Sequence, residues 1–384
     1  MGKILTWAIV AVVVVVGILA ITGTGERGVE IIKLGVLQPL TGDAASYGES
    51  ELRAIQVAVE EINAAGGIGG KQVELVVEDG KCDPQAGGTA AQKLVNVDGV
   101  KVIIGGACAG ETLAAAKVTE PAQVILLSPS ASSPAVTEAG DFVFRTYPSD
   151  ALAGKIAATY AYKELGVKKA AVFSELTDYA QGLREVYKKT FTDLGGQIVT
   201  DETYTTGDTD FKTQILKIKT AKADVVYVVP QTATPGIAIF KQLRENKVNV
   251  KFTTAEVLMD SQIAKDNADV LEGVIGVQPA VDWEGNPKAT VFRDAHRVKF
   301  GGADPGSFAA NAYDAVHLIH EGLAATMTEG TVNTDALRDW LYAVKDWPGA
   351  VGPLSMDANG DPLMGENVRK ILSGEVTDLG AYTP

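Results

Sequence analysis

The sequence is poor in cysteine, histidine and aromatic residues, and it carries fewer positive than negative charges. Its 384 residues include 2 cysteines, 3 histidines and 7% aromatic residues, and 34 Lys and Arg stand against 48 Asp and Glu. The formal net charge of −14, without any cluster of lysines and arginines, argues against a surface that binds nucleic acid. With 46% hydrophobic and 21% charged residues, the chain has enough apolar material for two compact domains.

The common motifs of enzymes are also missing. The sequence has no G-x-S-x-G or H-E-x-x-H motif, and Gly66–Lys71 lacks the first glycine and the following Ser or Thr of a phosphate loop. Gly23, Gly25 and Gly28 spell G-x-G-x-x-G, but they follow an apolar run of membrane length and no helix-opening pattern comes after them. We therefore expect no enzyme and no cofactor.

Two segments resemble metal sites but lack ligands. His317 and His320 have the spacing of neighbours on one helix face, yet no third and fourth zinc ligand lies nearby in the sequence. The segment 357–362 has carboxylates at alternate positions, but proline replaces the glycine of a calcium loop and no glutamate occupies its twelfth position. We expect the histidines on a helix face, the acidic segment in a turn, and no metal site.

The N-terminus predicts export. Lys3 precedes an apolar run over residues 4–21 that only Thr6 interrupts, and as a helix this run would be about 27 Å long. Gly23 and Gly25 fit the small residues of a signal-peptide cleavage site. A cleaved signal peptide and an uncleaved membrane anchor both remain open for residues 1–29, but no cysteine follows the run, which excludes a lipoprotein anchor. In either case the rest of the chain is expected outside the cytoplasm, in the periplasm or on the outer face of the cytoplasmic membrane.

Export gives a meaning to Cys82 and Cys108. An even number of cysteines in an oxidising compartment predicts a disulfide bond. The alternative, two reduced buried thiols, would require a cytosolic protein. By the entropy of the closed loop, the bond would stabilise the folded state by about 3.5 kcal/mol.

Strand and helix patterns alternate along the chain. The β-branched run 31–37 is typical of a buried parallel strand, the loop 38–48 follows, and apolar residues at spacings of three and four then predict a helix from Glu49 that Gly66 and Gly67 end. A turn is expected over Gly105–Thr112, directly after the third predicted strand of this lobe. This order predicts an α/β fold with a doubly wound parallel sheet.

The same pattern begins again after residues 142–150, which predicts a second Rossmann-like lobe. Further crossings between the lobes are expected at 278–283 and near 352–356, so three extended strands would form a hinge that allows closure. A cleft between two such lobes is the natural ligand site. The predicted division is a first lobe of residues 30–148 and 280–352, and a second lobe of residues 149–279 and 353–384.

The loop Ser128–Thr137, SPSASSPAVT, follows an apolar strand, and its hydroxyls can hold a polar ligand beyond the end of a parallel strand. An ordinary Ser/Pro turn remains the alternative. Hydroxyls and the N–H groups of helix N-termini can bind a carboxylate. Glu256, which follows the strand 250–254, could then meet an ammonium group, unless it is a solvated loop acid. Together these residues favour recognition of a small zwitterion.

Several segments, taken in order, resemble the branched-chain amino-acid binding proteins of ABC transporters, which are type I periplasmic binding proteins. The resemblance extends from about Ile31 to the end of the chain. The segments that carry it are IKLGVLQPLTGDAASYG, AVEEINAAGGIGGKQVELVVEDGKCDP, GGACAGET, LLSPSASSPAVT and FVFRT. The resemblance implies two α/β lobes joined by three crossovers, a disulfide between Cys82 and Cys108, and a protein that closes on an amino acid and delivers it to a membrane permease. We expect a monomer.

The resemblance also assigns roles in the site. The residues it places around a ligand carboxylate are Ala109, Gly110, Ser130, Ala131 and Ser132. Tyr179 and Glu256 would reach the ligand from the second lobe, Glu256 at its ammonium group, and Tyr47 and Phe308 would form aromatic walls.

Two residues depart from the family pattern. Ala109 stands where serine is common, so backbone N–H groups must replace one hydroxyl, and Gln231 stands where an aromatic residue is common, which predicts a more polar pocket. An amide, urea or an aromatic acid is therefore an alternative ligand. A membrane-anchored sensor ectodomain is an alternative role.

Overall fold

The computed structural model describes residues 31–384. The apolar N-terminal segment lies outside the described residues, so the choice between signal peptide and anchor stays a prediction. From Ile31 onward, no helix combines the length and the apolar character needed to cross a membrane.

The first part of the chain forms a parallel five-stranded sheet, and this sheet with its helices is called lobe 1. The strand order is β2-β1-β3-β4-β5, and every neighbouring pair is parallel. The strands are β1 (Ile31–Gln38), β2 (Gln72–Asp79), β3 (Val102–Gly105), β4 (Ile125–Ser128) and β5 (Val143–Arg145).

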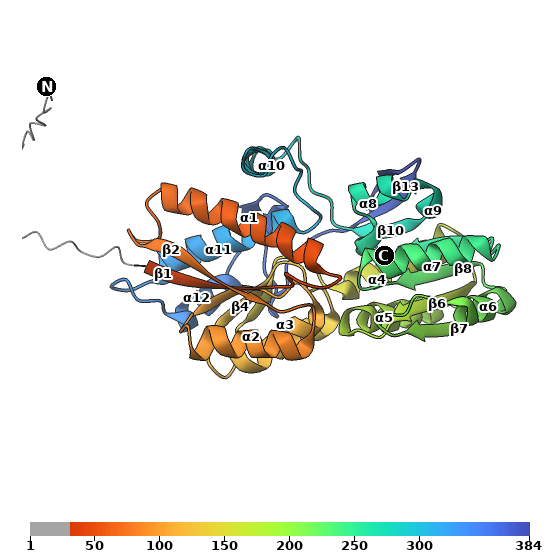
Figure 1. Ribbon diagram of the computed structural model, residues 1–384, viewed down its shortest axis with the longest axis horizontal. Coiled ribbons are helices and arrows are strands. Elements are labelled where there is room, and N and C mark those ends of the chain that lie inside the picture. The colour runs from red at the N-terminus through yellow and green to blue at the C-terminus, as the bar shows by residue number, and fades with distance from the viewer. Residues whose placement is uncertain (1–30) are drawn as a thin grey trace, which may run out of the picture.

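Helices cover both faces of this sheet (Figure 1), because consecutive apolar residues of its strands point to opposite sides. Ile104 of β3 packs in the cluster of one face, and Ile103 packs in the cluster of the other. The first face carries α1 (Ala45–Ala64), α10 (Pro287–Lys299), α11 (Ala309–Thr326) and α12 (Thr334–Tyr342), with the short hairpin β11 (Trp347–Gly349) and β12 (Gly352–Leu354). The second face carries α2 (Pro84–Asn96), α3 (Ala109–Thr119) and the 3-10 turn η1 (Pro134–Glu138).

The predicted helix of the first βαβ unit is present, but it begins earlier than the periodicity indicated. Helix α1 starts at Ala45 rather than at Glu49, so the end of the expected loop is its first turn. No side chain caps this end, so no capping residue marks the start of the helix in the sequence. At the other end, Gly67 has φ +74°, and a Cβ there would lie 1.9 Å from the Lys71 carbonyl oxygen, so the turn requires glycine.

The second sheet, with its helices, is called lobe 2 and has seven strands in the order β14-β13-β10-β9-β8-β6-β7. Its parallel strands are β6 (Lys169–Glu175), β7 (Gln197–Tyr204), β8 (Val225–Val229), β9 (Lys251–Thr254) and β10 (Ile275–Gln278). The C-terminal hairpin of β13 (Asn367–Leu372) and β14 (Glu375–Ala381) adds to β10 in the antiparallel direction.

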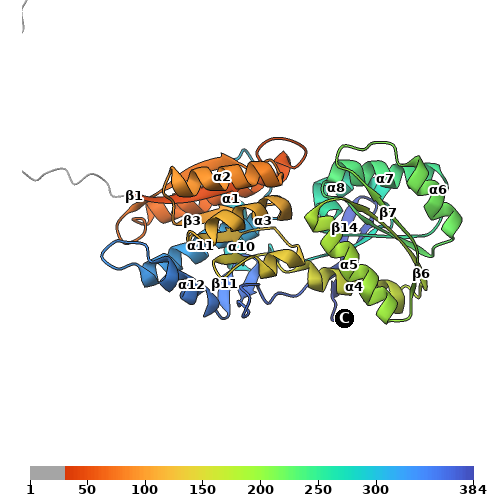
Figure 2. The same ribbon diagram turned by 90° about the horizontal axis from the view of Figure 1, so that it is seen from below.

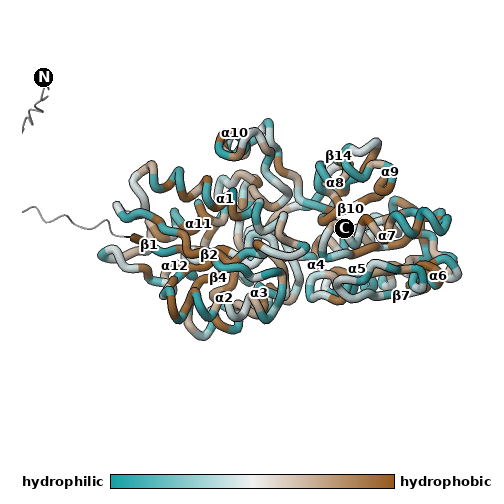
Figure 3. Tube along the Cα trace, viewed as in Figure 1, coloured by the Kyte–Doolittle hydropathy of each residue, from teal (hydrophilic) through white to brown (hydrophobic). Residues whose placement is uncertain are grey.

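Helices again pack on both faces of the lobe 2 sheet, and the hydropathy of the trace shows the apolar strands between more polar helices (Figure 3). One face carries α4 (Asp150–Lys163) and α5 (Asp178–Asp193). The other carries α6 (Lys212–Ala221), α7 (Ala233–Glu245), the turn η2 (Glu256–Leu258), α8 (Ser261–Asp266) and α9 (Ala268–Leu271). The predicted α/β class with two doubly wound sheets is confirmed.

The chain passes between the two lobes three times, and Figure 2 shows the lobes as separate bodies joined at one side. The connections run from β5 to α4, from β10 to α10, and from β12 to β13. The predicted lobe boundaries stay a prediction. The contacts of Asp361, whose carboxylate pairs with Arg145 of β5, favour an end of the lobe 1 segment later than residue 352.

The predicted disulfide between Cys82 and Cys108 is present, with the two Cα atoms 5.2 Å apart. It joins the loop after β2 to the N-cap of α3. The buried Glu111 carboxylate holds the same two loops, because it accepts the N–H groups of Cys82, Ala107 and Cys108 at 3.0, 2.7 and 3.1 Å.

Replacing both cysteines by serine should lower the free energy of unfolding by about 3.5 kcal/mol, because the unfolded chain regains the entropy of the open loop. Urea unfolding followed by circular dichroism measures this change. Wild-type protein unfolded under reducing conditions is the matched control and should give the same loss. A loss below about 1 kcal/mol in both would show that the Glu111 hydrogen bonds hold these loops without the bond.

Candidate ligand-binding site

A cavity lies between the loops at the carboxyl ends of the strands of both lobes. Nine of the ten predicted ligand-binding residues line it, namely Tyr47, Ala109, Ser130, Ala131, Ser132, Tyr179, Gln231, Glu256 and Phe308. The tenth, Gly110, does not line it, because it faces the other side of α3, where a Cβ would lie 3.1 Å from Pro84 and 3.2 Å from Asp178. The prediction also missed Ala107, Cys108 and Val257, which are chain neighbours of predicted residues.

The serine loop of lobe 1 divides its hydroxyls between structure and cavity. Ser128 makes structural bonds: its Oγ accepts the Ala131 N–H within the loop at 2.9 Å and donates to the carbonyl of Gly106, after β3, at 2.7 Å. Ser130 and Ser132 line the cavity instead. The turn interpretation therefore applies to Ser128, whereas the hydroxyls of Ser130 and Ser132 face the space that a ligand would occupy.

Each of the two cavity serines contacts a buried carboxyl group behind it. Ser130 Oγ lies 2.6 Å from Glu51 Oε1 and 3.2 Å from the Ala107 carbonyl oxygen. Ser132 Oγ lies 2.9 Å from Asp150 Oδ2. Sequence reasoning missed both acids, because Glu51 lies within a helix pattern and Asp150 at a crossing between lobes.

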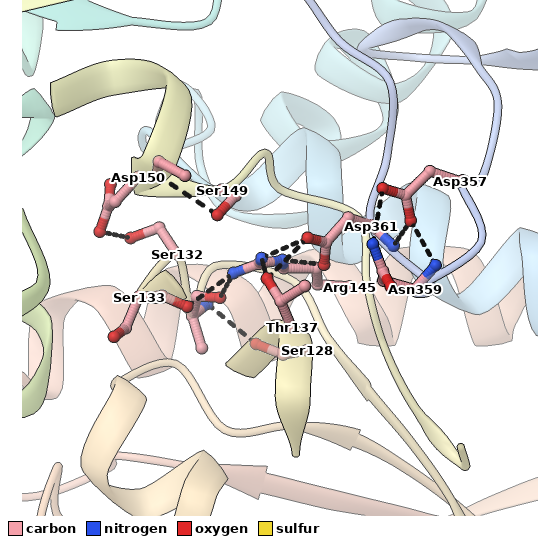
Figure 4. A network of polar contacts seen from close by, with 12 residues as sticks. Ser128, Ser132, Ser133, Thr137, Arg145, Ser149, Asp150, Asp357, Asn359 and Asp361 are labelled. Atoms are coloured by element: carbon pink, nitrogen blue, oxygen red, sulfur yellow. Dashed lines mark hydrogen bonds and ion pairs between the residues drawn. The ribbon is translucent and has the colours of Figure 1, made fainter. Parts of the chain in front are cut away.

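Arg145 fixes the shape of the serine loop, as Figure 4 shows. Its side chain is fully buried, and its Nη1 donates to the carbonyl oxygens of Ala131 and Ser133 at 3.2 and 3.0 Å. Its Nε and Nη2 form a two-point ion pair with the Asp361 carboxylate at 2.6 and 2.7 Å. The same Nη2 donates to Thr137 Oγ1 at 2.5 Å. The Arg145 guanidinium thus links the middle of the loop and its last residue, Thr137, to the third interlobe connection.

The lobe 2 wall of the cavity carries Glu256 and Tyr179. Glu256 begins the turn η2 directly after β9 and is only 4% exposed, so it is not a solvated loop acid. Burial raises the pKa of Glu256 to about 7, and the neighbouring Tyr179 hydroxyl partly opposes this rise. A buried carboxylate without a cation is costly, so an ammonium group would be a favourable partner there.

Two more acids lie close enough to Glu256 to interact with it. Asp150, the first residue of α4, and Glu366, just before β13, are both buried on interlobe connections. Burial and repulsion from Glu256 raise the pKa of each carboxyl well above its ordinary range. A negative charge on Glu256 therefore favours the protonated forms of Asp150 and Glu366.

Aromatic side chains form the remaining wall. Phe308, which precedes α11, meets Tyr47 edge to face with ring centres 5.8 Å apart. It meets Tyr147 in the same way at 5.3 Å. The space that they enclose with the serine loop is about 30 Å³, which is room for roughly two water molecules. A larger ligand can enter only if the lobes part.

A second cavity of about 270 Å³ adjoins the first, and Gln231 lines both. Polar residues predominate among those that line it, including Asp43 and Lys81 of lobe 1 and Glu175 and Thr206 of lobe 2, although most of the lining surface is apolar. The predicted polar character at Gln231 thus extends into a larger space towards the surface.

The expected turn and helix face are present where metal sites had been considered. Asp357 Oδ1 accepts the N–H groups of Asn359 and Asp361 at 2.7 and 3.0 Å, which makes the acidic segment a tight turn (Figure 4). His317 lies on α11 with its Nε2 3.3 Å from Glu61 Oε2. Across residues 31–384, no group of three or more His, Cys, Asp or Glu side chains has the geometry to hold a metal ion.

Comparison with known proteins shows clear relatives. A family model described as periplasmic binding protein matches residues 31–369. The leucine-, isoleucine-, valine-, threonine-, and alanine-binding protein of Pseudomonas aeruginosa is 31% identical over 86% of this chain and 87% of its own length.

Solved structures agree with that match. The substrate binding protein LivJ of a branched-chain amino acid transporter from Streptococcus pneumoniae, in complex with isoleucine, has 30% identity and a TM-score of 0.82, and the match covers 92% of this chain and all of that one (100%). An ABC transporter solute binding protein from Rhodopseudomonas palustris, in complex with 3,4-dihydroxy benzoic acid, has 26% identity and a TM-score of 0.80, with coverage of 92% and 97%. Proteins similar to this chain thus hold two chemical kinds of carboxylic acid.

Replacing Arg145 by alanine should lower the free energy of unfolding by about 3–5 kcal/mol, because the buried Asp361 carboxylate and two carbonyl oxygens lose their partner. Urea unfolding measures the change. Arg53, whose exposed side chain lies 3.7 Å from Glu49 on the same helix, provides the control, and its alanine variant should lose less than about 1 kcal/mol. Equal losses in the two variants would show that Arg145 does not organise the loop.

Proposed function

The chain belongs to the periplasmic binding protein family, and on that premise we propose that it is the solute-binding component of an ABC importer for an amino acid. It binds the amino acid between its two lobes outside the cytoplasm and delivers it to a membrane permease. It makes and breaks no covalent bond of the ligand. The disulfide between Cys82 and Cys108 supports an extracytoplasmic location, because such bonds persist in oxidising compartments.

One observation carries this proposal: the cavity presents a buried carboxylate on one lobe and hydroxyls beside a helix N-terminus on the other. Glu256 suits an ammonium group. Ser130, Ser132 and the start of α3 at Ala109 suit a carboxylate, because the N–H groups of a helix N-terminus carry partial positive charge. An α-amino acid carries its ammonium and carboxylate groups on the same carbon atom, so it satisfies both walls only when they come together.

Lobe closure follows from this two-sided site. A ligand that contacts both lobes is held fully only in the closed arrangement, and it shifts the lobes towards closure by the difference in its affinity for the closed and open states. The small volume between the walls requires the lobes to open before the ligand enters. The three interlobe connections are the segments that absorb this motion.

A second candidate is an aromatic acid or an amide on the same scaffold. Gln231 and the second cavity of about 270 Å³ favour it, because they offer polar space beyond what an aliphatic side chain needs. The similar solute binding protein from Rhodopseudomonas palustris, solved with 3,4-dihydroxy benzoic acid, supports it too. Such a ligand lacks an ammonium group, so it would not depend on Glu256.

Replacing Glu256 by glutamine should weaken binding of an α-amino acid by about 2–5 kcal/mol, or roughly 30-fold or more, because the ammonium group loses its charged partner. Calorimetric titration of the refolded full-length protein with L-leucine, L-isoleucine, L-alanine, 3,4-dihydroxybenzoate and acetamide measures this change. In the wild type, affinity for amino acids should also fall as the pH drops below about 7, because Glu256 must be ionised.

Glu245, an exposed acid on α7, gives the matched control, and its glutamine variant should bind as the wild type does. Unchanged binding in the Glu256 variant would remove this residue from the site. Binding of dihydroxybenzoate or acetamide with no response to amino acids would replace the proposed function by the second candidate.

A further inference from the structure

Glu51 of α1 is a buried acid directly behind the cavity that the proposed function leaves unused. It is 0% exposed, and its Oε1 lies 2.6 Å from Oγ of Ser130, which lines the cavity. Its Oε2 has no hydrogen-bond partner among the described residues. The amide of Gln38, at the end of β1, lies beside it, and both amide atoms are likewise buried and unpartnered within residues 31–384.

The surroundings of Glu51 oppose its negative charge. Glu111 of α3 faces it as a second buried acid, and Asp79 of β2 lies beyond Glu111. The charged groups of α10 and α11 pair with other acids of α1, since Lys299 bonds Glu60 and His317 contacts Glu61. Burial raises the pKa of Glu51 to about 8, with a smaller contribution from repulsion by Glu111, while the hydrogen-bonding groups of Ser130 and Gln38 partly oppose the rise.

The other cavity serine has a different environment. Asp150, behind Ser132, lies in the field of the Arg145 guanidinium and of Glu256, so several charges share control of its titration. Within residues 31–384, the main influences on the Glu51 carboxyl are its burial, Ser130, Gln38 and Glu111, and none of these is a cation. Protonation of Glu51 is therefore the simplest way to avoid the free-energy cost of a buried negative charge.

The proton on Glu51 decides what Ser130 offers to the cleft. An ionised Glu51 can only accept, so the single Ser130 hydroxyl proton points back to Oε1 and oxygen lone pairs face the ligand. A protonated Glu51 donates its own O–H to Ser130 Oγ across the same 2.6 Å, which releases the Ser130 proton. That proton then goes to the Ala107 carbonyl or to an acceptor in the cleft.

We propose that Glu51 is a positioning residue, protonated in the bound state, that turns Ser130 into a hydrogen-bond donor for the carboxylate of the ligand. This inference deepens the proposed function and rests on it for the ligand carboxylate. Where Glu51 is ionised beforehand, binding takes one proton from solvent onto Oε1, and no other bond changes. The site therefore selects a ligand with an anionic acceptor at this position, and its affinity falls at alkaline pH.

Calorimetric titration of the full-length wild type and the Glu51→Gln, Glu51→Leu and Ser130→Ala variants tests this proposal. The probes are L-leucine, L-isoleucine, benzoate and acetamide, at pH 7 and pH 9, in buffers that differ in ionisation enthalpy. At pH 9 the wild type should take up nearly one proton more per bound carboxylate than Glu51→Gln does. Its affinity should fall about tenfold more between pH 7 and pH 9 than that of this variant.

The variants separate positioning from packing. Glutamine keeps a donor for Ser130, so Glu51→Gln should bind within about threefold of the wild type at pH 7, whereas Glu51→Leu and Ser130→Ala should each lose about tenfold or more. Ionisation of the ligand itself is the same in all four proteins and cancels in the comparison. Acetamide, without a carboxylate, should show no dependence on Glu51.

Three outcomes are distinguishable. Equal proton uptake and equal pH dependence in the wild type and Glu51→Gln overturn the inference, while the proposed function stands because ligand binds. If benzoate binds with the expected dependence on Glu51 and no amino acid binds, the inference is supported and the proposal that the ligand is an amino acid is wrong.

Failure of every probe to bind the wild type overturns the proposed function alone, because thermal unfolding without ligand still tests Glu51. Its pKa is raised on folding from an ordinary value near 4.5, so its contribution to stability is full below about pH 4.5 and is lost as the pH rises to about 8. The unfolding midpoint of Glu51→Gln relative to the wild type should therefore rise across this window. A difference that does not change with pH overturns the inference.

Discussion

The site depends on the buried ion pair between Arg145 and Asp361. A guanidinium without access to water must satisfy its donors within the protein, and here its partners come from the serine loop, including Thr137 at its end, and from Asp361 in the turn of the third interlobe connection. These segments are far apart in the sequence, so the pair sets the position of the loop relative to the hinge. A buried pair of this kind adds little net stability, but losing one member leaves an unpaired charge, which makes the arrangement specific.

Several buried acidic residues lie in and behind the cleft near Arg145. Glu51, Asp150, Glu256 and Glu366 are all buried within or behind the cavity walls, and Arg145 is already occupied by Asp361. Burial disfavours the ionised form of each, so protons and a ligand ammonium group are the available counter-charges. Binding of an amino acid in this cleft is thus an exchange of protons and charges between solvent, acids and ligand, as well as a closure of two lobes.

Sequence reasoning succeeded where local pattern carries the information. β-branched runs followed by polar loops indicate parallel strands, and since the ends of such strands meet at one edge, the loops with Ser130, Glu256 and Gln231 could be placed at one site before any coordinates. It failed at helix starts without a capping signal. The expected turn at Gly105–Thr112 contains the start of α3 at Ala109, which was missed because the buried face of this helix mixes alanines with Glu111, Thr112 and Thr119 and so shows no apolar stripe.

The sequence by itself determined the alternation of strands and helices and the polar loops, because each depends on residues close together in the chain, and its two cysteines allow one disulfide pairing. Tertiary structure alone decided which serines face the cavity, on which side of α3 Gly110 lies, and which acids lie behind the ligand site. Glu51 and Ser130 are far apart in the sequence and meet only because α1 and the loop after β4 pack across the sheet edge. Burial and pairwise distance set the protonation of such groups, and these quantities exist only in the folded chain.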